Sequence, residues 1–166
     1  MRHARGIDKN GSISMHNDLL EVCRHLQAHG VRYILIGGQA LRLNGIVRAT
    51  EDIDIVVPFD EANGRRVIDS LAFLESAQEI DPHWFSREAN ADEIQNIRVA
   101  DRIVIDILFA ANGETYESLL PHFRELTVEG VTIPVLDLDG LLMTKTETRD
   151  KDKLDRLMLL RLKDNA

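Results

Sequence analysis

Aspartates alternate with isoleucines in residues 52–57, and this segment constrains the fold more than any other part of the chain. Its sequence, Asp-Ile-Asp-Ile-Val-Val, is rich in β-branched residues, which favour strands. Side chains alternate between the two faces of a strand, so Asp52 and Asp54 share one face and the isoleucines share the other. The apolar face must be buried in a core, while the opposite face carries two neighbouring carboxylates.

Two other apolar runs predict strands with an unusual residue at their end or centre. The segment from Val31 to Ile36 stops at Gly37-Gly38 and leads into a short helical pattern. The run from Ile103 to Phe109 is apolar except for Asp106. Burying a carboxylate among isoleucines is costly, so Asp106 is expected to have a partner or a metal ion.

The remaining periodicities complete a pattern of alternating helices and strands. Helical spacing of apolar residues is found at about 14–29, 39–44, 61–74 and 114–122, and from Asp137 to about Leu162 with a break near 149–150. Strands are expected at 31–36, 52–57, 94–100, 102–110, 125–129 and 131–136, while 76–90 is irregular. The predicted fold class is α/β (α+β), a small mixed sheet flanked by helices with a helical C-terminal appendage.

Length and composition favour one domain. The 166 residues are enough for one core but short for two. We expect a single domain at 13–166, with its core at about 31–136, a helical segment at 137–163 and flexible residues at 1–12. The one cysteine, Cys23, follows helical apolar spacing, so a buried structural thiol is favoured over a nucleophile.

Charge and hydropathy narrow the choice of partners and location. The net charge of −8 argues against broad binding to a nucleic-acid backbone, but a small anion could still bind through a metal ion and a few amides. No segment approaches the run of about 20 apolar residues that a membrane helix needs. The N-terminus lacks the apolar region of a signal peptide, so a cytoplasmic location is expected.

Each of the three unusual features also has a structural explanation when taken alone. Gly37-Gly38 after a strand is a common turn, although glycine also lets a backbone approach a phosphate closely. Asp52 and Asp54 either lie on a solvated strand face or hold a hard cation such as Mg²⁺ or Mn²⁺. Asp106 either caps or pairs at the end of its strand, or joins those two aspartates.

The order of the three features resembles the nucleotidyltransferase (polymerase β-like) superfamily. Gly37-Gly38 is followed after thirteen residues by Asp52-Ile53-Asp54-Ile55, and Asp106 stands on a later strand. That superfamily has a Gly-Gly or Gly-Ser turn, a spacer of roughly ten residues, an Asp-apolar-Asp/Glu motif and a late third carboxylate. The chain departs from it in two ways, because many members have Ser at the position of Gly38 and the spacer here is long.

The closer resemblance is to small bacterial members, the AbiEii-toxin-like and antibiotic-nucleotidyltransferase-like groups. Their Gly-Gly-x-Ala, Gly and Arg-x-Thr correspond to Gly37-Gly38-Gln39-Ala40, Gly45, and Arg48 with Thr50. Their C-terminal helical segment, with a Lys and a Lys-Asp-x-x-Asp motif, is matched by Lys145 and residues 151–155. The resemblance spans about Val31 to Leu160.

The resemblance implies a metal-dependent transfer of a nucleoside monophosphate from a nucleoside triphosphate to a hydroxyl acceptor. Asp52, Asp54 and Asp106 would be catalytic and would hold Mg²⁺ or Mn²⁺. Gly37 and Gly38 would contact the phosphates, and Arg48, Thr50 and Lys145 would belong to the nucleotide site. The acceptor is a small molecule, a protein or a tRNA end, and which triphosphate is used stays open.

Several of these residues have structural alternatives. Lys145 continues the apolar stripe of Leu138, Leu141 and Leu142, so it either meets an anion or extends to solvent at the edge of the stripe. Arg48 could instead pair with a carboxylate, and Thr50 could fill a turn. Residues 83–85, His-Trp-Phe, either anchor a loop by aromatic burial or form a wall on the acceptor side.

Two other function classes compete with an active enzyme. The chain could be a toxin–antitoxin or regulatory component that acts through a cognate partner protein. It could also be a catalytically silent member that binds nucleotide as a sensor. The presence of all three aspartates favours activity.

Overall fold

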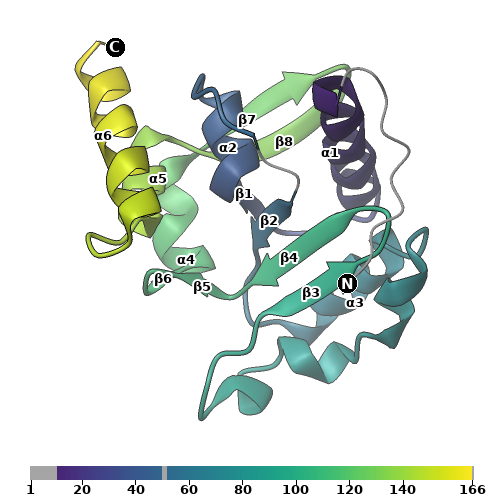
Figure 1. Cartoon of the computed structure of the whole chain (residues 1–166). Helices are drawn as coiled ribbons and strands as arrows, with labels where there is room; N and C mark the ends of the chain where they lie inside the picture. The colour runs from purple at the N-terminus through teal and green to yellow at the C-terminus, as the bar shows by residue number, and fades with distance from the viewer. Residues whose placement is uncertain (1–10, 50–51, 166) are drawn as a thin grey trace.

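A six-stranded mixed sheet forms the centre of the protein in the computed structural model, which describes residues 11–49 and 52–165. The strand order is β3-β4-β2-β1-β8-β7 (Figure 1). The pairs β2/β4 and β1/β8 are parallel, and the other neighbouring pairs are antiparallel. The strands are β1 (Ile34–Ile36), β2 (Ile53–Val56), β3 (Ile97–Ala100), β4 (Val104–Leu108), β7 (Phe123–Val128) and β8 (Val131–Leu136).

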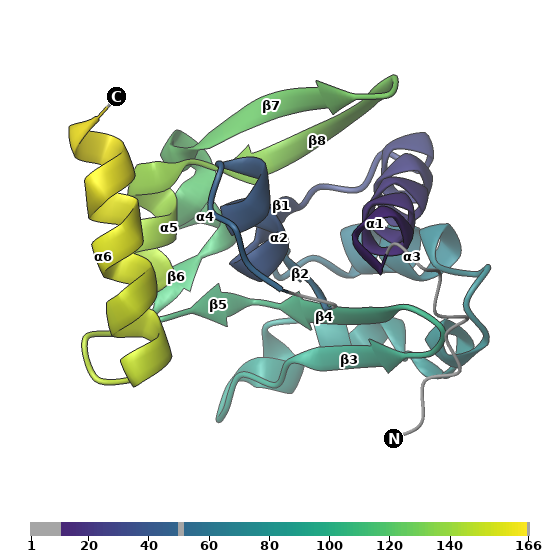
Figure 2. The ribbon, with the colours of Figure 1, turned by 45° about the horizontal axis from the view of Figure 1, so that its top comes forward.

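Helices surround this sheet and extend beyond it. Helix α1 packs against β8 and α3, whereas α5 and α6 pack against each other at the opposite end of the molecule (Figure 2). The helices are α1 (Gly11–Ala28), α2 (Gly37–Leu43), α3 (Glu61–Ser70), α4 (Tyr116–Leu119), α5 (Leu138–Thr144) and α6 (Asp150–Asp164). The mixed sheet with flanking helices and a helical C-terminal segment confirms the predicted fold class. In the described part of the chain, no helix has the length and apolar character to cross a membrane.

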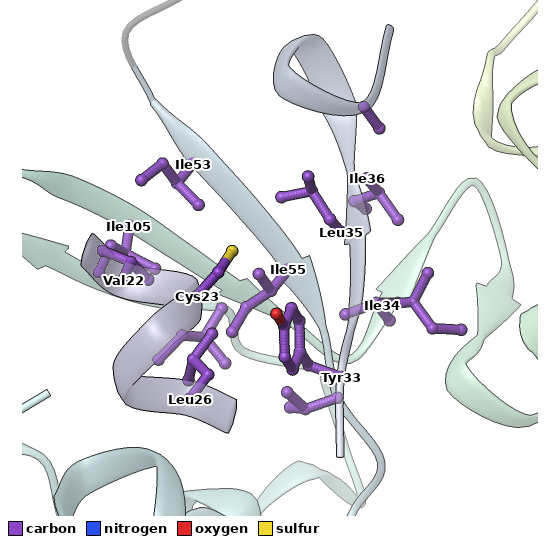
Figure 3. Close-up of a cluster of buried hydrophobic side chains, with 14 of the residues drawn as sticks. Val22, Cys23, Leu26, Tyr33, Ile34, Leu35, Ile36, Ile53, Ile55 and Ile105 are labelled. Carbon is purple, nitrogen blue, oxygen red and sulfur yellow. The ribbon is translucent and has the colours of Figure 1, made fainter. Parts of the chain in front are cut away.

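The core explains why the isoleucines and aspartates of β2 alternate. Val22, Cys23 and Leu26 of α1 lie beside Ile55 and Ile105 on one face of the sheet (Figure 3). All five side chains are fully buried, so the apolar half of each strand is covered by α1. Cys23 is therefore a buried structural residue, as predicted, and burial raises the pKa of its thiol to about 11. The opposite face of β2 is left for its carboxylates.

Local structure differs from the sequence prediction at the ends of several elements. Strands β1 and β3 begin three residues later than predicted, and α3 ends at Ser70 and not at residue 74. Helix α1 begins at Gly11, three residues before the predicted start, and α2 begins directly at Gly37. The helix predicted for 114–122 is shorter, because residues 114–115 form strand β6. Strand β6 (Glu114–Thr115) pairs with β5 (Ala110–Ala111) in a hairpin whose turn, Asn112-Gly113, has the two positive φ values of a tight turn.

Residues 75–90 form three short 3₁₀ turns, η1 (Glu75–Glu79), η2 (Pro82–Phe85) and η3 (Glu88–Asn90). Hydrophobic burial holds this irregular segment in place, because Phe85 is fully buried and meets the ring of Phe109 edge-on at 5.6 Å. Asp81 caps η2 by accepting a hydrogen bond from the amide of His83, and Pro82 occupies the first turn. The segment thus packs against the sheet through Phe85.

Gly64 should be required at its place inside α3 even though glycine is a poor helix former. A Cβ atom at Gly64 would lie 2.4 Å from Cγ of Phe85, so the close packing of α3 on η2 excludes a larger side chain. We expect Gly64→Ala to lower the free energy of unfolding by about 1–3 kcal/mol, because overpacking outweighs the gain in helix propensity. Urea denaturation measures this. Arg66→Ala, at an exposed position of the same helix, should stay within about 0.5 kcal/mol of wild type. A stabilised Gly64→Ala protein would contradict the packing argument.

Candidate functional site

Parallel pairing of β2 with β4 brings two aspartates side by side. Asp54 and Asp106 are direct partners in the register of the two strands, so their side chains lie on the same face. Asp52 immediately precedes β2, and its charge also acts on Asp54. The three aspartates that the sequence singled out therefore form one group, although they are separated by up to 54 residues (Asp52 to Asp106).

The carboxyl group of Asp54 is held in an environment that disfavours its charge. Burial raises its pKa first, the neighbouring Asp106 raises it further, and together with Asp52 they bring it to about 7. The charge of Lys145 acts in the opposite direction. Two carboxylates in contact repel each other unless a proton or a cation lies near them. The group is thus poised to bind positive charge close to neutral pH.

Arg98 of β3 supplies part of that positive charge. It is the register partner of Asp106 on the other side of β4, and one guanidinium nitrogen donates to both carboxylate oxygens of Asp106 at 3.1 and 3.2 Å. Its second nitrogen lies 3.4 Å from Oδ2 of Asp52. The guanidinium therefore bridges two of the three aspartates, and half of its side chain stays exposed to solvent.

Gly37 gives Asp54 the space that its carboxylate occupies. The backbone of Gly37 has φ +70°, and an added Cβ would lie 2.2 Å from Oδ2 of Asp54. This contact follows from the antiparallel register, in which Ile36 opposes Asp54 across β1 and β2. Gly37 is therefore needed for both its backbone conformation and its lack of a side chain. Gly38 follows it in the first turn of α2.

A second charged cluster lies where α5 meets α6. Asp155 of α6 is almost completely buried and forms ion pairs with two cationic side chains. The guanidinium of Arg48 contacts its Oδ2, and Nζ of Lys145 lies 3.1 Å from the same oxygen. The two positive charges offset the free-energy cost of burying this carboxylate. The carboxylate in turn holds both cationic side chains in place. Arg48 thus has the carboxylate partner that the structural explanation of its position expected.

Lys145 connects this cluster to the aspartate group. It follows the last residue of α5, and its side chain is only 12% exposed. Its charge also acts on Asp54. Of the two alternatives that the apolar stripe left open, Lys145 meets an anion, and that anion is Asp155.

The structure brings together most of the residues that the sequence predicted for the site. Asp52, Asp54, Asp106 and Gly37 are adjacent. Lys145 acts on Asp54 by its charge and pairs with Asp155, and Asp155 in turn pairs with Arg48. Thr50 lies outside the described residues.

Sequence reasoning did not assign a role to Arg98 or Asp155. The strand alternation of Ile97, Arg98 and Val99 could have placed Arg98 on the polar face. The buried face of α6, which contains Asp152 and Asp155 beside Leu159, could have marked Asp155 as a buried charge. In neither case does the sequence identify the partner.

The chemistry of the aspartate group suits a hard divalent cation. Carboxylate oxygens are the ligands that Mg²⁺ and Mn²⁺ prefer, and the repulsion between Asp54 and Asp106 would be relieved by such an ion. Among the described residues, no three His, Cys, Asp or Glu side chains converge closely enough to hold a metal ion in this arrangement. Arg98 is placed against two of the three carboxylates, so binding of a metal ion requires this side chain to move.

Comparison with known proteins finds a matching family model and a solved structure with a similar fold. The family model described as "Nucleotidyl transferase AbiEii toxin, Type IV TA system" matches residues 18–154. No curated protein matches the chain. Among solved structures, a protein of Thermotoga maritima described as a "putative nucleotidyltransferase" is 17% identical, with a TM-score of 0.52 over 99% of this chain and 94% of that one. At this identity the structural likeness supports the fold alone.

Replacing Gly37 should test the close contact with Asp54. We expect Gly37→Ala to lower the free energy of unfolding by about 2–4 kcal/mol, because it adds a clash with the carboxylate to the strain of a positive φ. Gly30→Ala is the matched control, since Gly30 has φ +65° but open space around it, and should cost only about 1–2 kcal/mol. Equal losses in urea denaturation would show that only backbone strain matters.

The raised pKa of Asp54 predicts how stability changes with pH. In metal-free protein with EDTA, the folded state keeps a proton on Asp54 up to about pH 7, whereas an unfolded aspartate releases it near pH 4. The contribution of Asp54 to wild-type stability therefore falls as the pH rises through this window. Asn mimics the neutral carboxyl, so Asp54→Asn should be more stable than wild type at pH 8 by about 1–3 kcal/mol, and by less at pH 5.

Denaturation at the two pH values measures this difference. Asp69→Asn, on the exposed side of α3, controls for the general loss of a carboxylate. An equal change in the free energy of unfolding at pH 5 and pH 8 for Asp54→Asn would contradict the raised pKa of this carboxyl group.

Proposed function

The chain belongs to the AbiEii nucleotidyltransferase toxin family, and from this we propose that it transfers a nucleoside monophosphate from a nucleoside triphosphate to a hydroxyl acceptor with the help of Mg²⁺ or Mn²⁺. The observation that carries the proposal is the pairing of Asp54 with Asp106 across β2 and β4, with Asp52 beside them. The strand register holds the carboxyl groups of Asp54 and Asp106 side by side, and such a pair favours an added cation because the two charges repel each other.

The three aspartates would hold the metal ion. When bound, it would supply positive charge to the reacting phosphate and to the entering and leaving oxygens. Asp54 would lose its proton as the cation binds. Arg98 would turn away from Asp52 and Asp106, and its exposed side chain has room to do so. The same guanidinium could then neutralise phosphate charge.

The transfer itself would form one bond and break one. The acceptor's hydroxyl oxygen would bond to the α-phosphorus of the triphosphate as the bond between that phosphorus and the bridging oxygen breaks, releasing pyrophosphate. Asp106 would accept the hydroxyl proton. Lys145, fixed by Asp155, would stabilise charge on the departing pyrophosphate, and the backbones of Gly37 and Gly38 would approach the phosphates.

Asp155 would act as a positioning residue. It contacts both Arg48 and Lys145 in a buried place, so neither cation can turn freely toward solvent. Arg48 would act indirectly, by holding Asp155 in place beside Lys145. The family description also refers to a toxin–antitoxin system, so we include a cognate partner protein in the proposal.

Isothermal titration of ATP, CTP, GTP and UTP with Mg²⁺ tests the proposal. We expect one or more triphosphates to bind wild-type protein, and binding to weaken at least tenfold (about 1.4 kcal/mol or more) in Asp54→Asn. Asp69→Asn should bind as wild type does. The same titration in EDTA should show a comparable loss, because the aspartates would act through the cation.

Two outcomes would contradict this assignment. Triphosphate binding that is equal in wild type and Asp54→Asn would remove the aspartate group from the nucleotide site. Absence of binding for all four triphosphates in folded protein would favour a role in partner binding. Since Asp54→Asn is expected to be at least as stable as wild type, a loss of binding cannot be attributed to unfolding.

A further inference from the structure

A pocket of about 410 Å³ opens beside β3, on the side of the sheet edge that the 3₁₀ turns cover. Its walls come from η1, η2 and η3 and from the residues that lead into β3. Arg98 belongs to this wall and also bridges Asp52 and Asp106. The pocket and the aspartate group therefore share Arg98, at the edge of the sheet opposite to β7.

An exposed aromatic ring is held rigidly in this wall. Trp84 is 45% exposed although its neighbour Phe85 is fully buried, so the chain anchors the segment with one ring and presents the other. Buried Asn90 fixes the backbone around it by donating to the carbonyl oxygens of Trp84 and Ser86, at 2.9 and 2.8 Å. Asn90 also accepts from the amide of Gln95 at 2.9 Å, which joins the turns to the start of β3. Of residues 83–85, Phe85 thus anchors the segment by aromatic burial, and Trp84 lines the pocket.

The remaining walls combine apolar and polar side chains and are not suited to a phosphate. Glu79 contributes a carboxylate, and Gln95 and Asn96 contribute side-chain amides that can both donate and accept. The only cation in the wall, Arg98, is already engaged by two aspartates. Buried Ile80 adds an apolar surface. A neutral planar ring with hydrogen-bonding edges matches this combination, and a carboxylate favours a ring that carries an amino group.

The features assigned to the triphosphate lie on the other side of the aspartates. Gly37 follows β1 and Lys145 follows α5, whereas the pocket lies beyond β4 at β3. The sheet order therefore places Asp54 and Asp106 between the two regions. A group bound in the pocket would extend past Arg98 toward Asp106, the residue proposed to accept the hydroxyl proton.

We propose that this pocket binds the acceptor through an amino-bearing nucleobase that stacks on Trp84, with the acceptor's hydroxyl directed past Arg98 to Asp106. The inference rests on the proposed function for its second part, while binding of the base does not depend on it. Stacking of a base on an aromatic side chain is worth about 1–3 kcal/mol. The base could come from a free nucleoside or from the end of an RNA strand.

Trp84 is the only tryptophan of the chain, so its fluorescence reports on this pocket directly. The experiment titrates adenosine, cytidine and uridine, which have no phosphate, into full-length protein without metal and with excitation at the red edge of tryptophan absorption. We expect saturable quenching by adenosine and cytidine and at least threefold weaker binding of uridine. Asp69→Asn, on the exposed side of α3, should give the same curves. Nucleoside quenching that persists at a saturating concentration of a triphosphate with Mg²⁺ separates this site from the triphosphate site.

Two variants on one turn give a matched control. Ala89 lines the pocket and Glu88 does not, and both side chains are exposed, so neither change should disturb folding. Ala89→Leu fills the pocket and should weaken nucleoside binding at least tenfold, while Glu88→Leu should bind as wild type does. Titration with a trinucleotide distinguishes the source, because an RNA end should bind more tightly than its terminal nucleoside and a small acceptor should not.

Three results would overturn the proposal. Absence of saturable quenching by every nucleoside, or equal binding by Ala89→Leu and wild type, would remove the base from the pocket. Equal affinity for uridine and cytidine would refute the requirement for an amino group. Loss of nucleoside binding at a saturating concentration of a triphosphate with Mg²⁺ would assign the pocket to the donor's base. Failure of the proposed function would instead be seen as triphosphate binding that is insensitive to Asp54→Asn, with nucleoside quenching retained.

Discussion

The repulsion between the carboxyl groups of Asp54 and Asp106 is the constraint around which the rest of the site is arranged. Their strands are parallel neighbours, so the side chains cannot separate without breaking the register that buries the isoleucines on the other face. Burial adds to the cost of charge and brings the pKa of Asp54 to about 7. Arg98 from one side and Lys145 from the other offset part of this cost. The pairing of β2 with β4 thus both buries the isoleucines and holds the two carboxyl groups together.

Close packing around these carboxylates leaves little freedom for the backbone. Gly37 sits against Oδ2 of Asp54, and a side chain there would occupy the position of the carboxylate. The C-terminal helices hold the cations in a comparable way, because buried Asp155 fixes Arg48 and Lys145 at one oxygen atom. Asp152 accepts from the amide and hydroxyl of Thr146, which ties the start of α6 to the segment after α5. The helical appendage therefore belongs to the site, since Lys145 and its anchor both come from it.

The position of the aspartates within the sheet gives the molecule two unlike sides. Toward β1 and α5 the neighbours are a glycine turn and a buried lysine, which suit phosphate groups. Toward β3 the neighbours are a bridging arginine and a pocket with an exposed tryptophan, a carboxylate and amides, which suit a neutral ring. A transfer between two substrates needs such a division, with the reacting atoms meeting at the carboxylates between them.

The sequence by itself determined most of the elements and singled out the charged residues that meet in the candidate site. The alternation of Asp and Ile predicted both the half-buried strand and the carboxylate face, and the apolar stripe of α5 marked Lys145 as a residue that meets an anion or extends to solvent. These are local properties, because strand and helix periods act over a few residues. Only the tertiary structure decided which groups meet. It set the parallel register of β2 with β4, paired Arg48 and Lys145 with Asp155, and placed Arg98 both beside the aspartates and in the wall of the pocket that contains Trp84. Such contacts join residues that lie far apart in the chain, and the free energy that selects them comes from packing of the whole core, which no local pattern records.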